Sequence, residues 1–102
     1  MRRVIEGKVY DTLTSAHLCD ISLKGLMRGD FEWEDTGLYK SPRGAYFLAG
    51  EGGARTRWAE KIAGGSQGGS GIEIVTEAEA KAMVERYAPH SYEEIFGAAE
   101  EG

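Results

Sequence analysis

The spacing of apolar residues at the start of the chain predicts a strand or hairpin followed by a helix. Residues 3–10 carry β-branched and aromatic side chains around Glu6-Gly7-Lys8, which predicts a first strand or a small hairpin. From Leu13 to about Leu26 the apolar positions approximate one face of a helix. Asp11, Thr12 and Thr14 lie at the start of that face and are suitable N-cap residues, so an N-terminal helix is expected.

The segment from Phe31 to Gly53 predicts a β-hairpin. Aromatic and acidic residues alternate over 31–35, as in a half-buried strand, and Thr36-Gly37 is a candidate bulge. Ser41-Pro42-Arg43-Gly44 provides proline and glycine where a four-residue turn needs them, and residues 45–48 run back. Glycines at 50, 52 and 53 end the returning strand in a hook around Glu51.

The second half of the chain is predicted to end in helices. Residues 56–63 suit a short helical turn or an irregular crossing segment, and the glycine-rich stretch 64–71 is predicted to be an exposed flexible loop. Ile72–Val75 alternates as a last strand. Thr76-Glu77-Ala78-Glu79 matches a capping box, followed by an apolar stripe at Ala80, Met83, Val84 and Tyr87. A second capping box is predicted to begin at Ser91.

These elements predict an α+β fold. We expect a small antiparallel β-sheet of three to four strands, packed against an N-terminal and a C-terminal helix in a single domain over residues 1–102. The tail 98–102 is expected to fray.

Charge narrows the range of partners. The chain has 17 acidic and 12 basic side chains, a net charge of −5, so direct binding to nucleic acid is not expected and a basic protein surface fits better. The single cysteine, Cys19, forms no internal disulfide and is predicted to be a buried thiol, which favours a reducing cytoplasm. No stretch is apolar enough for a signal peptide or a membrane span, so a soluble protein that stays in its host cell is expected.

An acidic run in the first strand of the predicted hairpin is the candidate contact surface. One interpretation is a solvated strand face. The other is a rigid row of carboxylates, about 6.5–7 Å apart on one face of a strand, that occupies a basic groove as a phosphate backbone does. The candidate partner-binding residues are Asp30, Glu32, Glu34, Asp35 and Glu51. The basic residues Arg55, Arg57 and Lys61 are expected to balance this charge locally.

Signatures of catalysis, metal or cofactor binding do not stand out. The glycine hook lacks the Lys and Ser or Thr of a phosphate-binding loop, and a structural turn explains it better than an anion nest. His17, His90 and Cys19 have no zinc-ligand spacing. The sequence therefore predicts no cofactor and no enzyme, although a small enzyme that binds an anion through the hook and Arg55 or Arg57 remains an alternative.

Several short motifs resemble a group of small proteins encoded by phages and integrative elements. They are G-K-x-Y-D-T at 7–12, L-Y-K and G-x-Y-F-L-x-G-E-G-G within 38–53, T-x-W at 56–58, and T-E-x-E-A with Y-E-E-I-F-G within 76–97. Some small mobile-element proteins of this kind are anti-CRISPRs, which bind a Cas effector stoichiometrically and block it.

The resemblance implies an inhibitor in the cytoplasm of a bacterial host. Its partner would be a Cas effector with a basic nucleic-acid-binding surface, blocked in nucleic-acid binding or nuclease recruitment. The alternative is a mobile-element accessory module that binds another host protein. An exposed sheet edge leaves both a monomer and a homodimer open.

Overall fold

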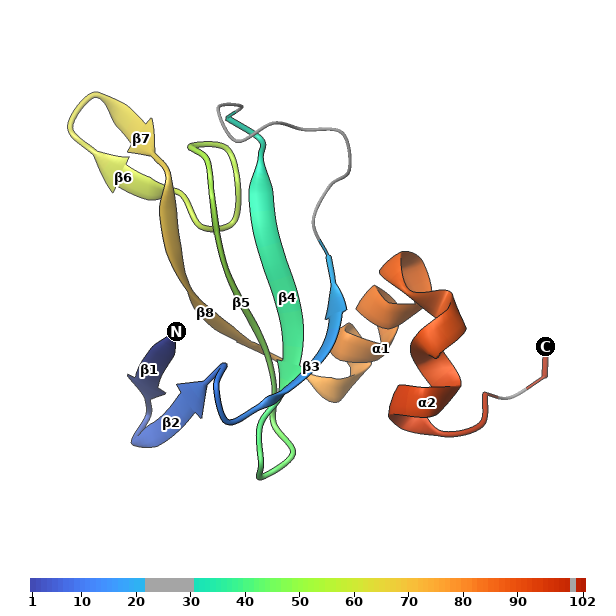
Figure 1. Cartoon of the computed structure of the whole chain (residues 1–102). Coiled ribbons are helices and arrows are strands. Elements are labelled where there is room, and N and C mark those ends of the chain that lie inside the picture. Colours follow the sequence, from blue (N-terminus) through green and yellow to red (C-terminus); the bar gives the residue numbers. More distant parts are fainter. Residues whose placement is uncertain (22–30, 100) are drawn as a thin grey trace.

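The protein is built around a four-stranded antiparallel sheet with the strand order β3-β4-β5-β8 (Figure 1). The computed structural model describes residues 1–21, 31–99 and 101–102. The sheet strands are β3 (Ala16–Asp20), β4 (Glu34–Lys40), β5 (Tyr46–Gly52) and β8 (Gly69–Val75). Two hairpins add β1 (Arg2–Ile5) with β2 (Lys8–Asp11), and β6 (Glu60–Ile62) with β7 (Gly65–Gln67). The chain ends in α1 (Glu77–Tyr87), a 3₁₀ turn (Pro89–Ser91) and α2 (Tyr92–Phe96).

The N-terminal region is a hairpin followed by a strand. Glu6 and Gly7 both have positive φ (51° and 77°), as the two-residue turn of a tight hairpin requires, so the hairpin alternative of the sequence prediction is correct. The predicted helix over 13–26 is wrong for its described part, because β3 occupies Ala16–Asp20. Residues 22–26 of that prediction lie outside the described residues. The α+β class holds, but its helices are C-terminal.

The predicted central hairpin is confirmed, with differences in detail. β4 and β5 pair from Glu34↔Gly52 to Lys40↔Tyr46 and are joined by the predicted turn, in which Gly44 has a φ of 88°. Thr36 and Gly37 pair regularly with β5, so the bulge predicted there is wrong. The register of pairing shifts instead between β3 and β4, where β3 passes from His17 to Cys19.

The glycine-rich stretch is more regular than predicted. Where a flexible loop was expected over 64–71, β7 and the start of β8 form, and β8 pairs with β5 from Gly69 onward. Residues 56–63 contain a turn and β6 rather than a helical turn. Ile72–Val75 is confirmed as part of the last sheet strand.

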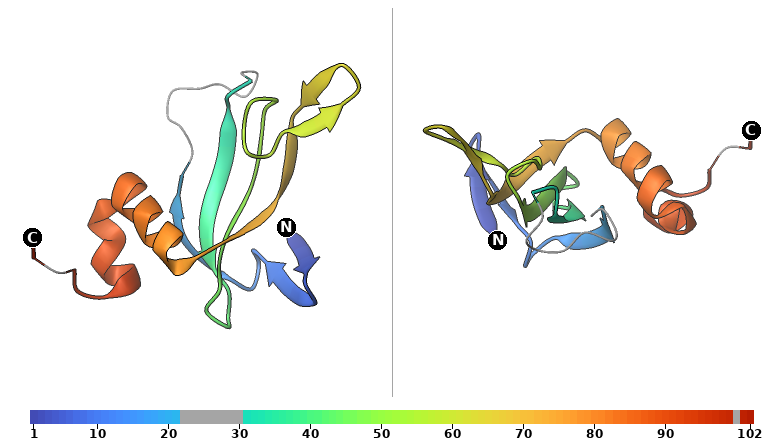
Figure 2. Two further views of the ribbon diagram at one scale, coloured as in Figure 1. Left: turned by 180° about the vertical axis from the view of Figure 1, so that it is seen from behind. Right: turned by 90° about the horizontal axis from the view of Figure 1, so that it is seen from above.

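The two faces of the sheet carry two cores. On one face, Leu38 and Leu48 pack with Ala80 and Val84 of α1. On the other face, Phe47 packs with Ala49, Ile72 and Tyr10 of the β1–β2 hairpin. Figure 2 shows the helices and this hairpin on opposite sides of the sheet. β4 and β5 therefore lie between two layers, which explains why residues 36–38 and 46–49 are buried in succession.

The first C-terminal helix begins at the predicted capping box. The backbone N–H of Glu79 donates to the Thr76 hydroxyl at 3.1 Å, and the Glu79 carboxylate accepts from the Thr76 N–H at 3.0 Å. The stripe Ala80, Met83, Val84 and Tyr87 faces the core as predicted. Ser91 precedes α2 but makes no side-chain capping bond, so the second capping box is wrong although the helix itself forms. Within the described residues, the structure contains no helix that is long and apolar enough to cross a membrane.

Candidate partner-binding face

Glu34 does not belong to an outward row of acids. It is only 8% exposed and lies, with Thr36 and Leu38, on the sheet face that α1 covers. Asp35 is exposed on the opposite face, because successive side chains of a strand alternate. Glu32 is exposed but precedes β4, and Asp30 lies outside the described residues. The predicted row of carboxylates on one strand face is therefore wrong.

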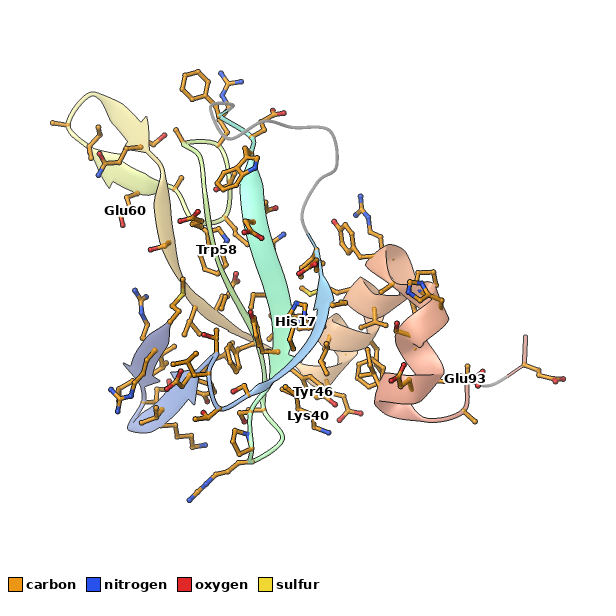
Figure 3. All side chains as sticks on the ribbon, viewed as in Figure 1. His17, Lys40, Tyr46, Trp58, Glu60 and Glu93 are labelled. Atoms are coloured by element: carbon orange, nitrogen blue, oxygen red, sulfur yellow. The ribbon has the colours of Figure 1, made fainter. Side chains whose placement is uncertain are left out.

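The buried Glu34 carboxylate is held by a polar network. The Arg57 Nε–H donates to Glu34 Oε2 at 3.0 Å, and Arg57 Nη2 donates to Oε1 at 3.4 Å. The Thr36 hydroxyl donates to Glu34 Oε2 at 2.7 Å and accepts the indole N–H of Trp58 at 2.8 Å. Trp58, labelled in Figure 3, is itself buried in the core. The prediction that the basic segment balances the acids locally is confirmed for Arg57, and the role of Glu34 is to join this segment to the sheet.

Three other carboxylates gather on the opposite face of the sheet. Asp35 and Glu51 are direct partners across β4 and β5, and Asp20 of β3 lies opposite Gly37 of β4. All three line one hollow of about 290 Å³, which we call the acidic hollow. The remaining lining residues are Met1, Thr12, Gly37, Tyr39, Ala49 and Gly50. Among the residues that the structure describes, no Lys or Arg side chain lines it. Met1, which does line it, carries the N-terminal ammonium, and this group donates to Thr12 Oγ1 at 2.9 Å.

A glycine in β4 shapes the side of this hollow. A Cβ atom at Gly37 would lie 2.9 Å from the Tyr39 ring and 3.2 Å from the His17 ring, closer than side chains normally approach. The two rings are 5.2 Å apart between centroids, and His17 Nε2 lies 2.9 Å from Asp20 Oδ1. Figure 3 labels His17 on β3 beside β4. A larger residue at position 37 would therefore require the Tyr39 and His17 rings to shift from this arrangement.

The electric field of the acids reaches the neighbouring side chains. The pKa of Tyr39 is raised by its partial burial and, in smaller part, by the negative charges of Asp20 and Asp35. The pKa of the buried Cys19 thiol is raised first by burial and then by Asp20. In both cases the neighbouring carboxylates add to burial in disfavouring a further negative charge.

Removing one carboxylate from the acidic hollow should lower the pKa of Tyr39. Replacing Asp35 with Asn removes one negative charge, so the pKa of Tyr39 should fall while remaining above its ordinary value through burial. The measurement is the absorbance of tyrosinate against pH, with Tyr39→Phe assigning the transition. Because the folded-state pKa is raised, Tyr39 contributes stability that is complete below its unfolded pKa of about 10 and is lost as the pH rises through the folded value.

A matched charge change elsewhere provides the control for this titration. Glu85 is exposed on α1, and Glu85→Gln should leave the Tyr39 transition in place. An Asp35→Asn protein with an unmoved Tyr39 transition would show that the carboxylate does not act on the ring.

The glycine hook is part of the sheet. β5 extends to Gly52 and pairs with both β4 and β8, and the Gly53 N–H donates to the Trp33 carbonyl at 2.8 Å. The hook thus forms a strand end instead of an anion nest. Arg55 lies over the Phe31 ring at 5.9 Å from its centroid, while Arg57 is paired with Glu34. Over the described ranges, no group of three or more His, Cys, Asp or Glu side chains is arranged to hold a metal ion.

Comparison with known proteins found no match to this chain. No protein-family model matches the chain, and neither a curated protein nor a solved structure matches it.

Asp20 is the member of the acidic hollow that the sequence prediction missed. The prediction placed it inside a helix, where its neighbours would differ. The alternation of Cys19, Asp20 and Ile21 contains the signal, since both flanking residues are buried and Asp20 is exposed. Two of the predicted residues, Asp35 and Glu51, are brought together in this hollow.

Proposed function

We propose that this protein binds a basic surface of a partner protein through the acidic hollow. The observation that carries the proposal is the convergence of Asp20, Asp35 and Glu51, from three strands, on one hollow that no described Lys or Arg side chain lines. Adjacent strands of a sheet hold their side chains at fixed spacing, so the carboxylates are positioned before a partner arrives. Such a patch speeds encounter with a cationic surface and selects against anionic ones.

We further propose that the partner is a bacterial Cas effector and that binding inhibits it in the host cytoplasm. The support for this partner is the resemblance of the sequence motifs to small mobile-element proteins, together with the net charge of −5. A Cas effector handles nucleic acid on basic surfaces, which an acidic protein can occupy in place of a phosphate backbone. The inhibitor in this proposal is stoichiometric and performs no chemistry.

The test combines affinity capture with a DNA-binding assay. The tagged protein is used to capture partners from a CRISPR-bearing bacterium, and the recovered effector is assayed for binding to its target DNA. We expect the protein to reduce DNA binding at a one-to-one ratio, and higher salt to slow the association of the complex. A capture without any Cas subunit would exclude the Cas assignment and favour another host partner.

A pair of variants tests the acidic hollow itself. The first variant carries Asp20→Asn, Asp35→Asn and Glu51→Gln, and the second neutralises three exposed acids outside the hollow, Glu85, Glu94 and Glu101. Both change the net charge by the same amount. We expect the first variant to bind the partner at least about tenfold more weakly than the second. Equal binding by the two variants would place the contact elsewhere.

A further inference from the structure

A second hollow lies between the β1–β2 hairpin and the turn that joins β4 to β5. Its volume is about 530 Å³, and its walls are mostly apolar. The hairpin contributes Lys8, Val9 and Tyr10 to the lining, and the turn contributes Pro42, Arg43 and Ala45. We call it the cationic hollow.

The charges of this hollow are opposite to those of the protein as a whole. Of the described residues that line it, Lys8 and Arg43 are the charged ones, although the chain has 17 acidic and 12 basic side chains. In the part of the chain that the structure describes, neither cation forms an ion pair with a carboxylate. The two cations therefore remain available to an anion, one on each wall.

Both walls are held in shape by tight turns. The hairpin wall closes at the positive-φ residues Glu6 and Gly7. In the other wall the Ser41 N–H donates to the Ala45 carbonyl at 2.8 Å, and the Ser41 hydroxyl accepts the Ala45 N–H at 3.0 Å. Tyr10 is buried edge-on against Phe47, with ring centroids 5.6 Å apart. A ligand would meet a hollow that is already formed, which lowers the entropic cost of binding.

We propose that the cationic hollow binds an extended peptide segment of a partner protein, in which an apolar side chain is flanked by Asp or Glu. The apolar walls remove the apolar side chain from water, and Lys8 and Arg43 pair with the flanking carboxylates. The cations lie on different walls, so a ligand that uses both must span the hollow, as a peptide does. The proposal is independent of the Cas assignment and of the acidic hollow, because it concerns a different set of residues and the opposite charge.

Peptide selection with the purified full chain tests this proposal. A phage library of random heptapeptides is selected on the protein, and a fluorescein-labelled copy of an enriched peptide is titrated by fluorescence anisotropy. We expect the enriched sequences to combine an apolar residue with adjacent Asp or Glu. Lys8→Gln with Arg43→Gln should weaken binding of the labelled peptide about tenfold, the order expected for two surface ion pairs.

The control variant changes the charge equally at other sites. Lys40 lies over the Tyr46 ring and Lys61 is exposed on β6, and neither lines the hollow. Lys40→Gln with Lys61→Gln should leave the peptide affinity within twofold of the parent. Amide chemical shifts on titration should move at residues 7–10 and 41–45. Thermal unfolding of each variant shows that weaker binding does not reflect loss of the fold.

Three results would overturn the proposal. One is a selection that enriches no apolar-acidic pattern. Another is a peptide that binds the Lys8 and Arg43 variant as tightly as the control, or whose shifts cluster outside the hollow. The third is binding of benzoate or hexanoate at the hollow with no peptide binding, which would assign it to a small carboxylate.

Discussion

Replacing Phe47 with Ala is expected to lower the free energy of unfolding by about 3–5 kcal/mol, the range for truncating a fully buried aromatic residue. Phe47 is 0% exposed. Its ring stacks on Tyr39 at 5.4 Å between centroids and meets Tyr10 edge-on at 5.6 Å. Since small domains are stable by only about 5–15 kcal/mol, this loss removes a large part of the total. Urea unfolding followed by tryptophan fluorescence measures it.

Phe31→Ala is the matched control for this variant. The Phe31 side chain is 66% exposed, so its truncation should change the free energy of unfolding by no more than about 0.5 kcal/mol. A loss below about 1 kcal/mol for Phe47→Ala would contradict the described core. The variant should also loosen the β1–β2 hairpin, because Tyr10 loses the ring against which it packs. That hairpin contributes residues to both hollows.

Replacing Arg57 with Met is expected to lower the free energy of unfolding by about 3 kcal/mol. The substitution keeps a long side chain but leaves the Glu34 carboxylate buried with no cation. An uncompensated buried charge is costly because it loses both water and its partner. The Arg57 side chain is 29% exposed, which places the expected loss at the lower end of the range for buried pairs. Urea unfolding is again the measurement.

Lys81→Met is the matched control for the Arg57 variant. Lys81 pairs with Glu77 at 3.2 Å, but that carboxylate is 64% exposed and water can solvate it when the pair is broken. The loss should be below about 1 kcal/mol. The double variant Glu34→Met with Arg57→Met should recover part of the stability, since two apolar side chains leave no unpaired charge. If Arg57→Met and Lys81→Met cost the same, the Glu34 network does not stabilise the fold as described.

The parts of the fold that the sequence predicted correctly have local causes. The α1 capping box depends on Thr76 and Glu79, which are three residues apart, and the β4–β5 turn depends on residues 41–44. In Ile72–Val75, apolar and polar residues alternate at the start of the segment itself. In each case the residues that determine the structure are neighbours in sequence, so their pattern was sufficient.

The missed features depend on contacts between distant segments. Residues 13–21 match a helical face only if Leu13 and Ala16 are buried, whereas both are exposed and β3 pairs with β4. Glu34 is buried because Arg57, 23 residues later, supplies its counter-charge. The glycine-rich strand β8 gains its order from pairing with β5. Local propensity could not reveal these partners.

The acidic site was predictable in composition but not in arrangement. Asp35 and Glu51 were both candidates, yet only the β4–β5 register makes them direct neighbours, and Asp20 joins them through β3. Glu34 and Asp35 are adjacent in sequence but lie on opposite faces. The negative charge of the surface thus follows from composition, while the position of the acidic hollow depends on how the strands pair.

The β1–β2 hairpin and its flanking residues contribute to both hollows. They contribute to the acidic hollow through Met1 and Thr12, which flank the hairpin, and to the cationic hollow through residues 7–10. Three carboxylates on one side and two cations on the other form a local electric dipole. A charged molecule that approaches exerts a torque on the protein, because a dipole aligns in an external field. Molecules of this protein should therefore rotate into a preferred orientation before contact, and reversing either end of the dipole should slow productive encounters at low salt.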